Sequence, residues 1–203
     1  ALYLDSVLKE GNGITFYRDN LFRAVVRGMK SVEDSDYVVP ASLQQVLRGY
    51  QKTGYRWLKT LDVNGFGGIL ADDMGLGKTI QIIALLQAEA EEHPESQSLI
   101  VCPASLVYNW ENELNRFAPG LTVQTVTGTA PEREEILKIA AQLGTEHLET
   151  AASETTVQAD AQESAEAIGH PQILITSYDL LKRDIACYEP FQFRFQVIDE
   201  AQY

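Results

Sequence analysis

The strongest constraint on the fold is a regular alternation of short apolar runs with longer amphipathic runs, which begins at Leu43. The short runs are continuous and apolar, as in SLIVCP, QILITS and FQVIDE. Such runs are typical of strands in a parallel sheet whose two faces are covered by helices. The longer runs place apolar residues at helical spacing, as in KTIQIIALLQAEAEE. The alternation therefore predicts an α/β fold, a doubly wound parallel sheet with helices on both faces.

The expected elements follow one another along the chain. The expected strands are residues 67–72, 98–103, 121–126, 172–177 and 195–200. The expected helices are residues 43–61, 78–92, 105–117, 131–143 and 178–188.

Two stretches do not fit this alternation. Residues 1–40 end in an extended linker at Pro40, and we expect them to be the tail of an upstream domain plus that linker. The α/β domain is then expected over residues 41–203. Residues 144–169 are rich in Ala, Glu, Thr and Gln, with few large apolar side chains, so we expect a solvated and partly disordered insertion.

The chain is acidic overall, which argues against nucleic-acid binding through a broad basic surface. The formal net charge is −13, but residues 129–169 alone carry nine acidic and two basic side chains, so more than half of the excess is local. A segment of this charge should project away from any bound nucleic acid or contact a protein partner. An inert solvated loop is the simpler interpretation.

Location and metal content are constrained mainly by what the sequence lacks. No run of roughly eighteen apolar residues occurs, so no membrane span is predicted. The first residues lack the basic region and apolar core of a signal peptide, which predicts a cytoplasmic protein. The two cysteines and three histidines are scattered, so no zinc site is predicted.

The stretch GGILADDMGLGKTIQ places a glycine-rich turn between an expected strand and an expected helix. Gly75 and Gly77 would let backbone N–H groups curl around phosphate oxygens at the positive end of the helix dipole. Lys78 would reach the β- and γ-phosphates, and Thr79 would bind Mg²⁺ through its hydroxyl. The usual pattern has glycine where this chain has Asp72. A plain strand-to-helix turn with a stray lysine is the alternative interpretation.

Two adjacent carboxylates, Asp199 and Glu200, lie at the end of the last expected strand, in FQVIDEAQ. Asp199 would hold Mg²⁺, and Glu200 would polarise the water that attacks the γ-phosphate. An apolar strand that ends in two acids is common, so this feature gains its meaning from the phosphate loop.

Five motifs, in order, resemble those of the Swi/Snf-type helicase-like ATPases of helicase superfamily two, with wording most similar to the bacterial members. They are LRGYQKTGYRWL, DDMGLGKT, LIVCPASLVYNWENELNRF, ILITSYDLLKRD and VIDEAQY. The resemblance covers roughly residues 43–203. It implies a RecA-like lobe, the use of ATP and Mg²⁺, and a motor that acts on double-stranded DNA, located with the nucleoid. An acid is tolerated at the Asp72 position in that family.

The resemblance also implies individual roles. Gln51 would read the adenine edge, and Lys78 and Glu200 would be catalytic. The expected nucleotide-binding residues are Gln51, Asp73, Met74, Gly75, Leu76, Gly77, Lys78 and Thr79, and the expected metal ligands are Thr79 and Asp199.

Members of the family carry two such lobes, with ATP between them. The chain ends at its D-E-A-Q motif, so we expect an N-terminal lobe without the second lobe and its arginine finger. Such a finger is typically worth about 10³ to 10⁵ in rate. The isolated chain should therefore hydrolyse ATP poorly, whereas the full-length protein is expected to be a DNA-dependent ATPase.

Two of the motifs would line the path of one DNA strand, through Ser105, Asn109, Thr176, Ser177 and Tyr178. Contacts of this kind go to phosphates and carry no sequence information. Ser105 and Ser177 each open an expected helix, so helix capping is an equal alternative. The two tryptophans, Trp57 and Trp110, are expected in the core rather than in base stacking.

Other functions are kept as alternatives. A strand-separating helicase of the same superfamily differs only in its substrate. A small GTPase or nucleotide kinase would fit the phosphate loop, but no guanine-reading N-K-x-D motif occurs. A non-catalytic binding module would be favoured by loss of Lys78 or Glu200, and both are present.

Overall fold

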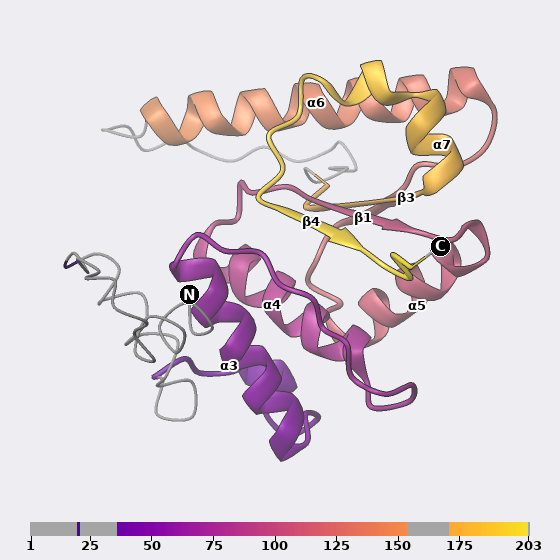
Figure 1. Ribbon diagram of the computed structural model, residues 1–203. Helices are drawn as coiled ribbons and strands as arrows, with labels where there is room; N and C mark the ends of the chain where they lie inside the picture. The colour runs from indigo at the N-terminus through magenta and orange to yellow at the C-terminus, as the bar shows by residue number, and fades with distance from the viewer. Residues whose placement is uncertain (1–19, 21–35, 154–170, 203) are drawn as a thin grey trace, which may run out of the picture. The chain divides into compact units, whose positions relative to one another are not determined.

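The computed structural model describes Asn20 and residues 36–153 and 171–202, with side chains of residues 143–153 left aside (Figure 1). Most of the expected upstream tail, residues 1–35, lies outside these ranges apart from Asn20, as do residues 154–169 of the expected insertion. The described helices and strands are η1 (Ala41–Leu43), α3 (Gly49–Val63), α4 (Lys78–Glu92), β1 (Ser98–Cys102), η2 (Ala104–Leu106), α5 (Val107–Phe117), β2 (Val123–Thr125), α6 (Ala130–Ser153), β3 (Ile173–Ser177), α7 (Tyr178–Arg183), η3 (Ile185–Tyr188) and β4 (Phe195–Ile198).

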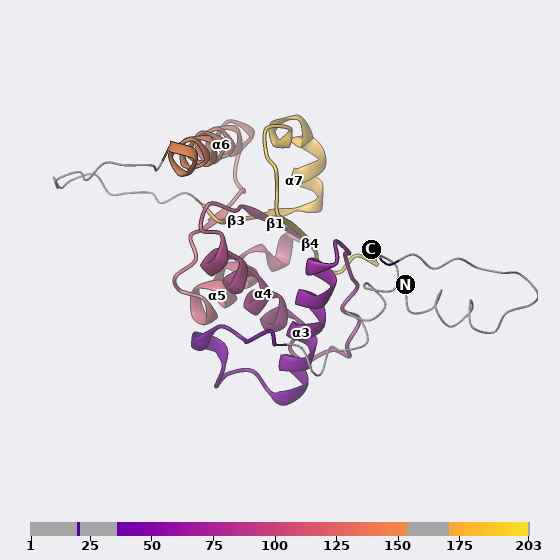
Figure 2. The same ribbon diagram turned by 90° about the vertical axis from the view of Figure 1, so that its left-hand side faces the viewer.

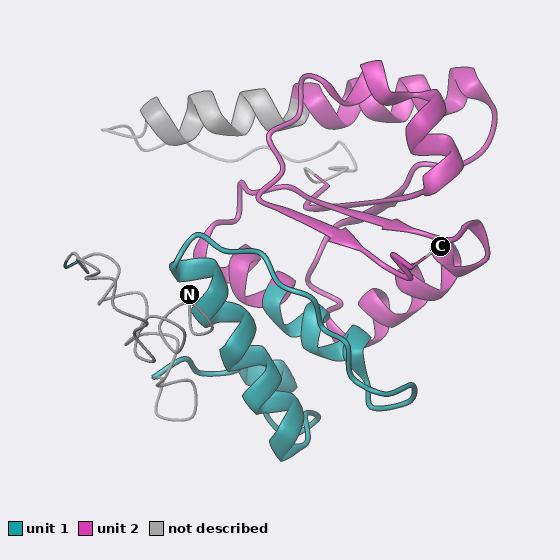
Figure 3. Ribbon diagram, viewed as in Figure 1, with its two compact units in different colours: residues 1–85 teal, residues 86–203 magenta. Residues whose placement is uncertain are grey.

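The chain divides into two compact units, Ala1–Leu85 and Leu86–Tyr203 (Figure 3). The first contains α3, the glycine-rich loop and the start of α4. The second contains the whole described sheet and the helices that pack on it. No helix in the described ranges combines the length and apolar character that a bilayer span requires.

The second unit is built on a four-stranded parallel sheet with the order β2-β3-β1-β4. Figure 2 shows α5 against one face of this sheet and α6 and α7 on the other. The predicted α/β class, the parallel sheet and the cover on both faces are confirmed.

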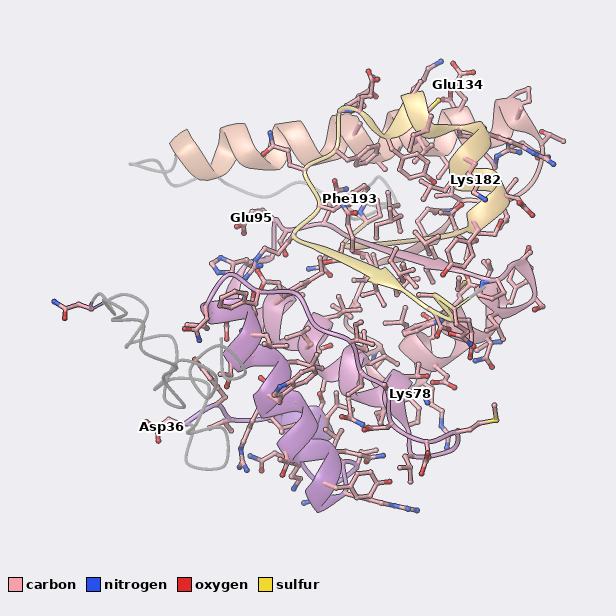
Figure 4. All side chains as sticks on the ribbon, viewed as in Figure 1. Asp36, Lys78, Glu95, Glu134, Lys182 and Phe193 are labelled. Atoms are coloured by element: carbon pink, nitrogen blue, oxygen red, sulfur yellow. The ribbon has the colours of Figure 1, made fainter. Side chains whose placement is uncertain are left out.

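Burial follows the position of each strand in the sheet. Every residue of β1 and β3 is buried, because these central strands have a neighbour on each side and helices on each face. In β4, at the edge, exposure alternates, and Ile198 is 48% exposed. The core on the α6 side is formed by Leu99, Val101, Val126, Leu137, Ala140, Leu174 and Tyr188. Phe193, labelled in Figure 4, packs on its rim and stacks on Phe191 at a centroid separation of 5.1 Å.

A buried ion pair fixes the end of α7 against the start of α6. The Arg133 guanidinium donates to both carboxylate oxygens of Asp184, at 2.6 and 2.9 Å, and to the carbonyl of Gly128 at 2.7 Å. The two side chains are only 6% and 14% exposed. Asp184 is also the residue at which α7 stops and η3 follows, so the expected helix over residues 178–188 is interrupted where this carboxylate turns to Arg133.

A buried glutamine joins the middle of α6 to the chain just before β3. The side-chain amide of Gln97 donates to the carbonyls of Ala140 and Pro171, at 3.2 and 3.1 Å. Gln97 is 9% exposed and lies just before β1. One side chain therefore connects α6, the start of β1 and the approach to β3.

Besides the helix interrupted at Asp184, three further expected elements differ from the structure. Residues 67–72 form no strand, and Ile69 is 86% exposed, since no ladder partner pairs with them in the described part of the chain. The helix expected from Leu43 begins at Gly49, because Arg48 is extended and its N–H donates to the Gln51 side chain. Helix α6 runs ten residues beyond the expected end, to Ser153, since a single interior glycine costs only about 1 kcal/mol.

Replacing Asp184 by Asn should lower the melting temperature, because Arg133 would stay buried without a charged partner. The hydrogen bonds from Arg133 hold the pKa of Asp184 below its ordinary value. A lowered folded-state pKa adds stability above the ordinary pKa, and this stability is lost as the pH falls through the lowered value. The loss in melting temperature should therefore be largest near neutral pH and shrink below about pH 4.

The loss in melting temperature is measured by thermal unfolding, followed by circular dichroism, at several pH values between 7 and 3. Asp179→Asn is the matched control, since it removes an exposed carboxylate from the same helix. A loss in Asp184→Asn that does not change with pH would contradict the role of the ion pair.

Candidate functional site

The glycine-rich loop that precedes α4 adopts backbone angles open mainly to glycine. Gly75 and Gly77 have φ values of +83° and +73°. L side chains rarely adopt this left-handed region, and at Gly77 an added Cβ would also lie 2.5 Å from the Gln51 side-chain nitrogen. The positive φ values explain why both positions hold glycine, and the binding of phosphate by the backbone N–H groups stays a prediction.

Lys78, the first residue of α4, folds back onto the loop that it follows (Figure 4). Its ammonium group donates to the carbonyls of Asp72 and Asp73, at 2.7 and 3.3 Å. A phosphate group bound at this loop would be an alternative acceptor for the hydrogen bonds of the ammonium group. The side chain is partly exposed, so its charge is accessible.

Helix α3 braces the loop from the side. The Gln51 amide donates to the carbonyl of Leu76 at 2.9 Å, and the Tyr50 hydroxyl donates to the same oxygen at 3.1 Å. The Gln51 side-chain oxygen accepts from the Arg48 N–H at 2.9 Å. Gln51 is 7% exposed, and this bracing is a role that the sequence did not reveal. Its reading of adenine stays a prediction.

Asp72, which replaces the usual glycine, has a defined partner. The Gln81 side chain in α4 donates to the Asp72 carboxylate at 3.2 Å and to the Gly77 carbonyl at 3.3 Å. Gln81 is 1% exposed and fills the space beside Gly54 of α3, where an added Cβ would lie 1.8 Å from its side-chain oxygen. The acid therefore ties the start of the loop to the helix that follows it, and Gly54 makes room for the connecting side chain.

The carboxyl end of β4 carries Asp199, which is held by several hydrogen bonds within the second unit. Its N–H continues the ladder by donating to the Val101 carbonyl at 2.9 Å. One carboxylate oxygen accepts from the Trp110 indole at 2.9 Å, and the other accepts from the Glu200 N–H at 3.0 Å. The Tyr178 hydroxyl donates to the Asp199 carbonyl at 2.5 Å.

Two weakly acidic groups near Asp199 are kept neutral. Burial, with a further contribution from the Asp199 charge, raises the pKa of Cys102 to about 11. Burial and the same charge also raise the pKa of Tyr178. Tyr178 therefore acts as a hydrogen-bond donor at neutral pH.

Glu200 is the one residue other than glycine in the described ranges with a positive φ, at 53°. This conformation costs about 1–2 kcal/mol for an L residue. Strain of this kind is often found at functional sites, where the surroundings hold a side chain in a required direction. The Glu200 carboxylate is half-buried and accepts a hydrogen bond from the Gln202 amide.

The residues expected to contact DNA differ in their exposure. Ser105 and Asn109 are exposed, on η2 and α5. Thr176 and Ser177 are 0% and 3% exposed, and their hydroxyls bond to the Val126 carbonyl and the Leu180 N–H. The capping alternative is confirmed for Ser177, and any contact to DNA from these two residues would have to involve backbone groups or a local rearrangement.

The backbone and side chains of the loop are compatible with a bound phosphate group. The loop turns through two glycines of positive φ, and the Lys78 ammonium group bonds to carbonyls rather than to a counter-ion. Within the described residues, no three His, Cys, Asp or Glu side chains gather as a metal site. Mg²⁺ usually needs only one or two carboxylates beside phosphate and water. The assignment of Thr79 and Asp199 as its ligands stays a prediction.

Comparison with known proteins gives consistent matches. The family model described as the SNF2-related domain matches residues 50–203. An uncharacterized ATP-dependent helicase of Mycoplasma pneumoniae is 35% identical over 189 residues, covering 90% of this chain and 15% of that protein. The chromatin-remodeling ATPase INO80 of Sclerotinia sclerotiorum is 36% identical over 170 residues, covering 83% of this chain and 9% of that protein.

A solved structure agrees with the sequence matches. The SWI2/SNF2 ATPase core of Sulfolobus solfataricus in complex with double-stranded DNA aligns with a TM-score of 0.57 and 32% identity. The alignment covers 83% of this chain and 28% of that chain. The parallel sheet with helices on both faces is therefore confirmed as the RecA-like lobe fold, and the chain spans only a small part of the relatives that it matches.

Gly77→Ala should destabilise the first unit more than Gly75→Ala does. Both variants carry the left-handed backbone cost of about 1–2 kcal/mol, but Gly75 faces open space. At Gly77 the new methyl group also displaces Gln51 from the Leu76 carbonyl. Thermal unfolding, with amide hydrogen exchange at residues 72–80, measures the difference. Equal effects of the two variants would show that the contact from Gln51 does not hold the loop.

Proposed function

The chain belongs to the SNF2-related family, and from this premise we propose that it forms the ATP-binding first lobe of an ATP-dependent motor on double-stranded DNA. The observation that carries the proposal is the loop at residues 72–79. Its two glycines of positive φ turn the backbone just before α4, and Lys78 bonds to the carbonyls of the same loop. Fixed N–H donors, a lysine and a helix N-terminus are the groups that bind nucleotide phosphates.

In this proposal Lys78 holds the β- and γ-phosphates, and Thr79 and Asp199 are ligands for Mg²⁺. The metal supplies charge neutralisation at the phosphate oxygens. Glu200 takes the proton of the attacking water, and its strained backbone keeps the carboxylate in the required direction. The bracing of the loop by Gln51 limits movement of the N–H groups that bind phosphate.

Double-stranded DNA is the proposed partner, as in the solved complex from Sulfolobus solfataricus. Ser105 and Asn109 are the most accessible of the expected contacts, and they could bond to phosphates without reading sequence. We propose that the acidic insertion at residues 144–169 stays away from the DNA. A protein that acts on duplex DNA in a bacterium would work at the nucleoid.

The test is ATP turnover by the full-length protein, with duplex DNA, single-stranded DNA and no DNA. Stimulation by duplex supports the proposal, and stimulation by single strands alone would favour a strand-separating helicase. Absence of turnover in a folded protein would favour a non-catalytic binding module. Residues 1–203 alone should be slower by about 10³-fold or more if an arginine from elsewhere in the protein is needed.

Lys78→Ala and Glu200→Gln should each remove duplex-stimulated turnover, for different reasons. Loss of the Lys78 charge weakens nucleotide binding, whereas Glu200→Gln removes the base and should lower the rate by about 10² to 10⁴-fold with binding retained. Turnover assays and binding of a fluorescent ATP analogue separate the two. Lys52→Ala and Glu189→Gln are matched controls elsewhere in the chain. Full activity in Glu200→Gln would contradict the assignment of the base.

A further inference from the structure

Asp199 is held by side chains from two helices that carry expected DNA contacts. Trp110 lies on α5, directly after the exposed Asn109, and its indole N–H donates to one carboxylate oxygen of Asp199 at 2.9 Å. Tyr178, the first residue of α7, donates to the Asp199 carbonyl at 2.5 Å. Neither contact follows from the sequence, since Trp110 and Asp199 are 89 residues apart.

The hydrogen bonds leave the carboxylate with a defined orientation. A carboxylate offers roughly four lone-pair directions on its two oxygens. The Trp110 indole occupies one direction on the first oxygen, and the Glu200 N–H occupies one on the second. One lone pair on each oxygen remains for a metal ion or for its water ligands. Without the indole, rotation about the Asp199 side-chain bonds would be limited by the Glu200 N–H alone.

We propose that Trp110 is a positioning residue, which holds the Asp199 carboxylate in the orientation needed for Mg²⁺–nucleotide and links it to the DNA-contacting helix α5. The inference rests on the proposed function above. Trp110 is 3% exposed, so its ring cannot stack on a DNA base without leaving the core. Its N–H is the polar group of that ring, and it points to the carboxylate rather than to a neutral acceptor.

The link to α5 has a simple mechanical basis. Asn109 and Trp110 are consecutive residues of one helix, so a displacement of α5 when Asn109 meets a phosphate also moves the indole. Val107 and Leu114, from the same helix, are buried with Trp110, which makes α5 move as a packed body. A shift of the indole changes the geometry of its hydrogen bond to the Asp199 carboxylate. The stimulation of ATP turnover by duplex DNA should therefore depend on the indole N–H.

A merely structural role for Trp110 is the competing explanation, and Trp110→Phe separates the two. Phenylalanine keeps a buried aromatic ring but has no N–H to donate. The chain contains one other tryptophan, Trp57 on α3, so Trp57→Phe is a matched control for the loss of an indole. Tyr178→Phe tests the second contact, since it removes only the hydroxyl.

The first experiment tests the hydrogen bond itself, independently of any activity. Indole N–H exchange in the 203-residue chain is followed by NMR, with the two indole signals assigned through Trp57→Phe. We expect slow exchange at Trp110, accelerated by roughly tenfold to a hundredfold in Asp199→Ala, which is the range for a lost hydrogen bond to a charged group. Asp199→Asn, which keeps the shape, should give a smaller acceleration. Exchange at Trp110 that is unchanged in both variants would overturn the proposal.

The second experiment uses the full-length protein and measures turnover against Mg²⁺ concentration, with and without duplex DNA. Trp110→Phe should raise the Mg²⁺ concentration for half-maximal turnover and reduce the fold stimulation by duplex. DNA binding in the absence of nucleotide should stay unchanged, and Trp57→Phe should match the wild type. A Trp110→Phe protein with wild-type Mg²⁺ dependence and stimulation would overturn the positioning role.

Failure of the two proposals can be told apart. If the wild type shows no duplex-stimulated turnover, the proposed function fails, and the positioning role that rests on it fails with it, whatever the indole exchange shows. If the wild type is stimulated and Trp110→Phe behaves as Trp57→Phe does, the proposed function stands and the positioning role alone is rejected.

Discussion

The second unit depends on the parallel pairing of β1 with two strands that are far away in the sequence, β3 and β4. Parallel pairing sends the carboxyl ends of all three strands to one edge of the sheet. At that edge lie Cys102, Ser177 and Asp199, each followed by an irregular segment or a helix. The carboxyl edge of a parallel sheet is where ligands bind in folds of this class. The clustering of the polar groups is therefore a consequence of the strand order.

Buried polar side chains fix the helix ends and loops that the hydrogen bonds of the sheet do not reach. Arg133 and Asp184 join α6 to the end of α7, and Gln97 joins α6 to the chain just before β3. In the first unit, Gln81 connects Asp72 to α4. Buried polar groups are costly unless they are hydrogen-bonded, so each of these contacts fixes a loop or a helix end in one arrangement. The site residues sit on backbone positioned in this way.

Prediction from sequence succeeded for elements whose structure depends on their own residues. It failed for elements whose structure depends on a partner far away in the sequence. Helix α4 begins and ends where its apolar spacing indicated, and SLIVC and ILITS are the buried central strands. Residues 67–72 are equally apolar but form no strand, because a strand exists only with a paired neighbour. Ser177 opens a helix as its residue type suggested, yet the burial of Thr176 beside it follows from its place in the central strand β3.

The sequence by itself determined the α/β class, the family and the turn of the glycine-rich loop, since the positive φ values of Gly75 and Gly77 are a matter of local backbone geometry. Only the tertiary structure decided which side chains hold those groups. Gln51 on the Leu76 carbonyl and Trp110 on Asp199 join residues 25 and 89 positions apart. Such contacts follow from how helices pack on a sheet, and neither spacing nor composition records that packing.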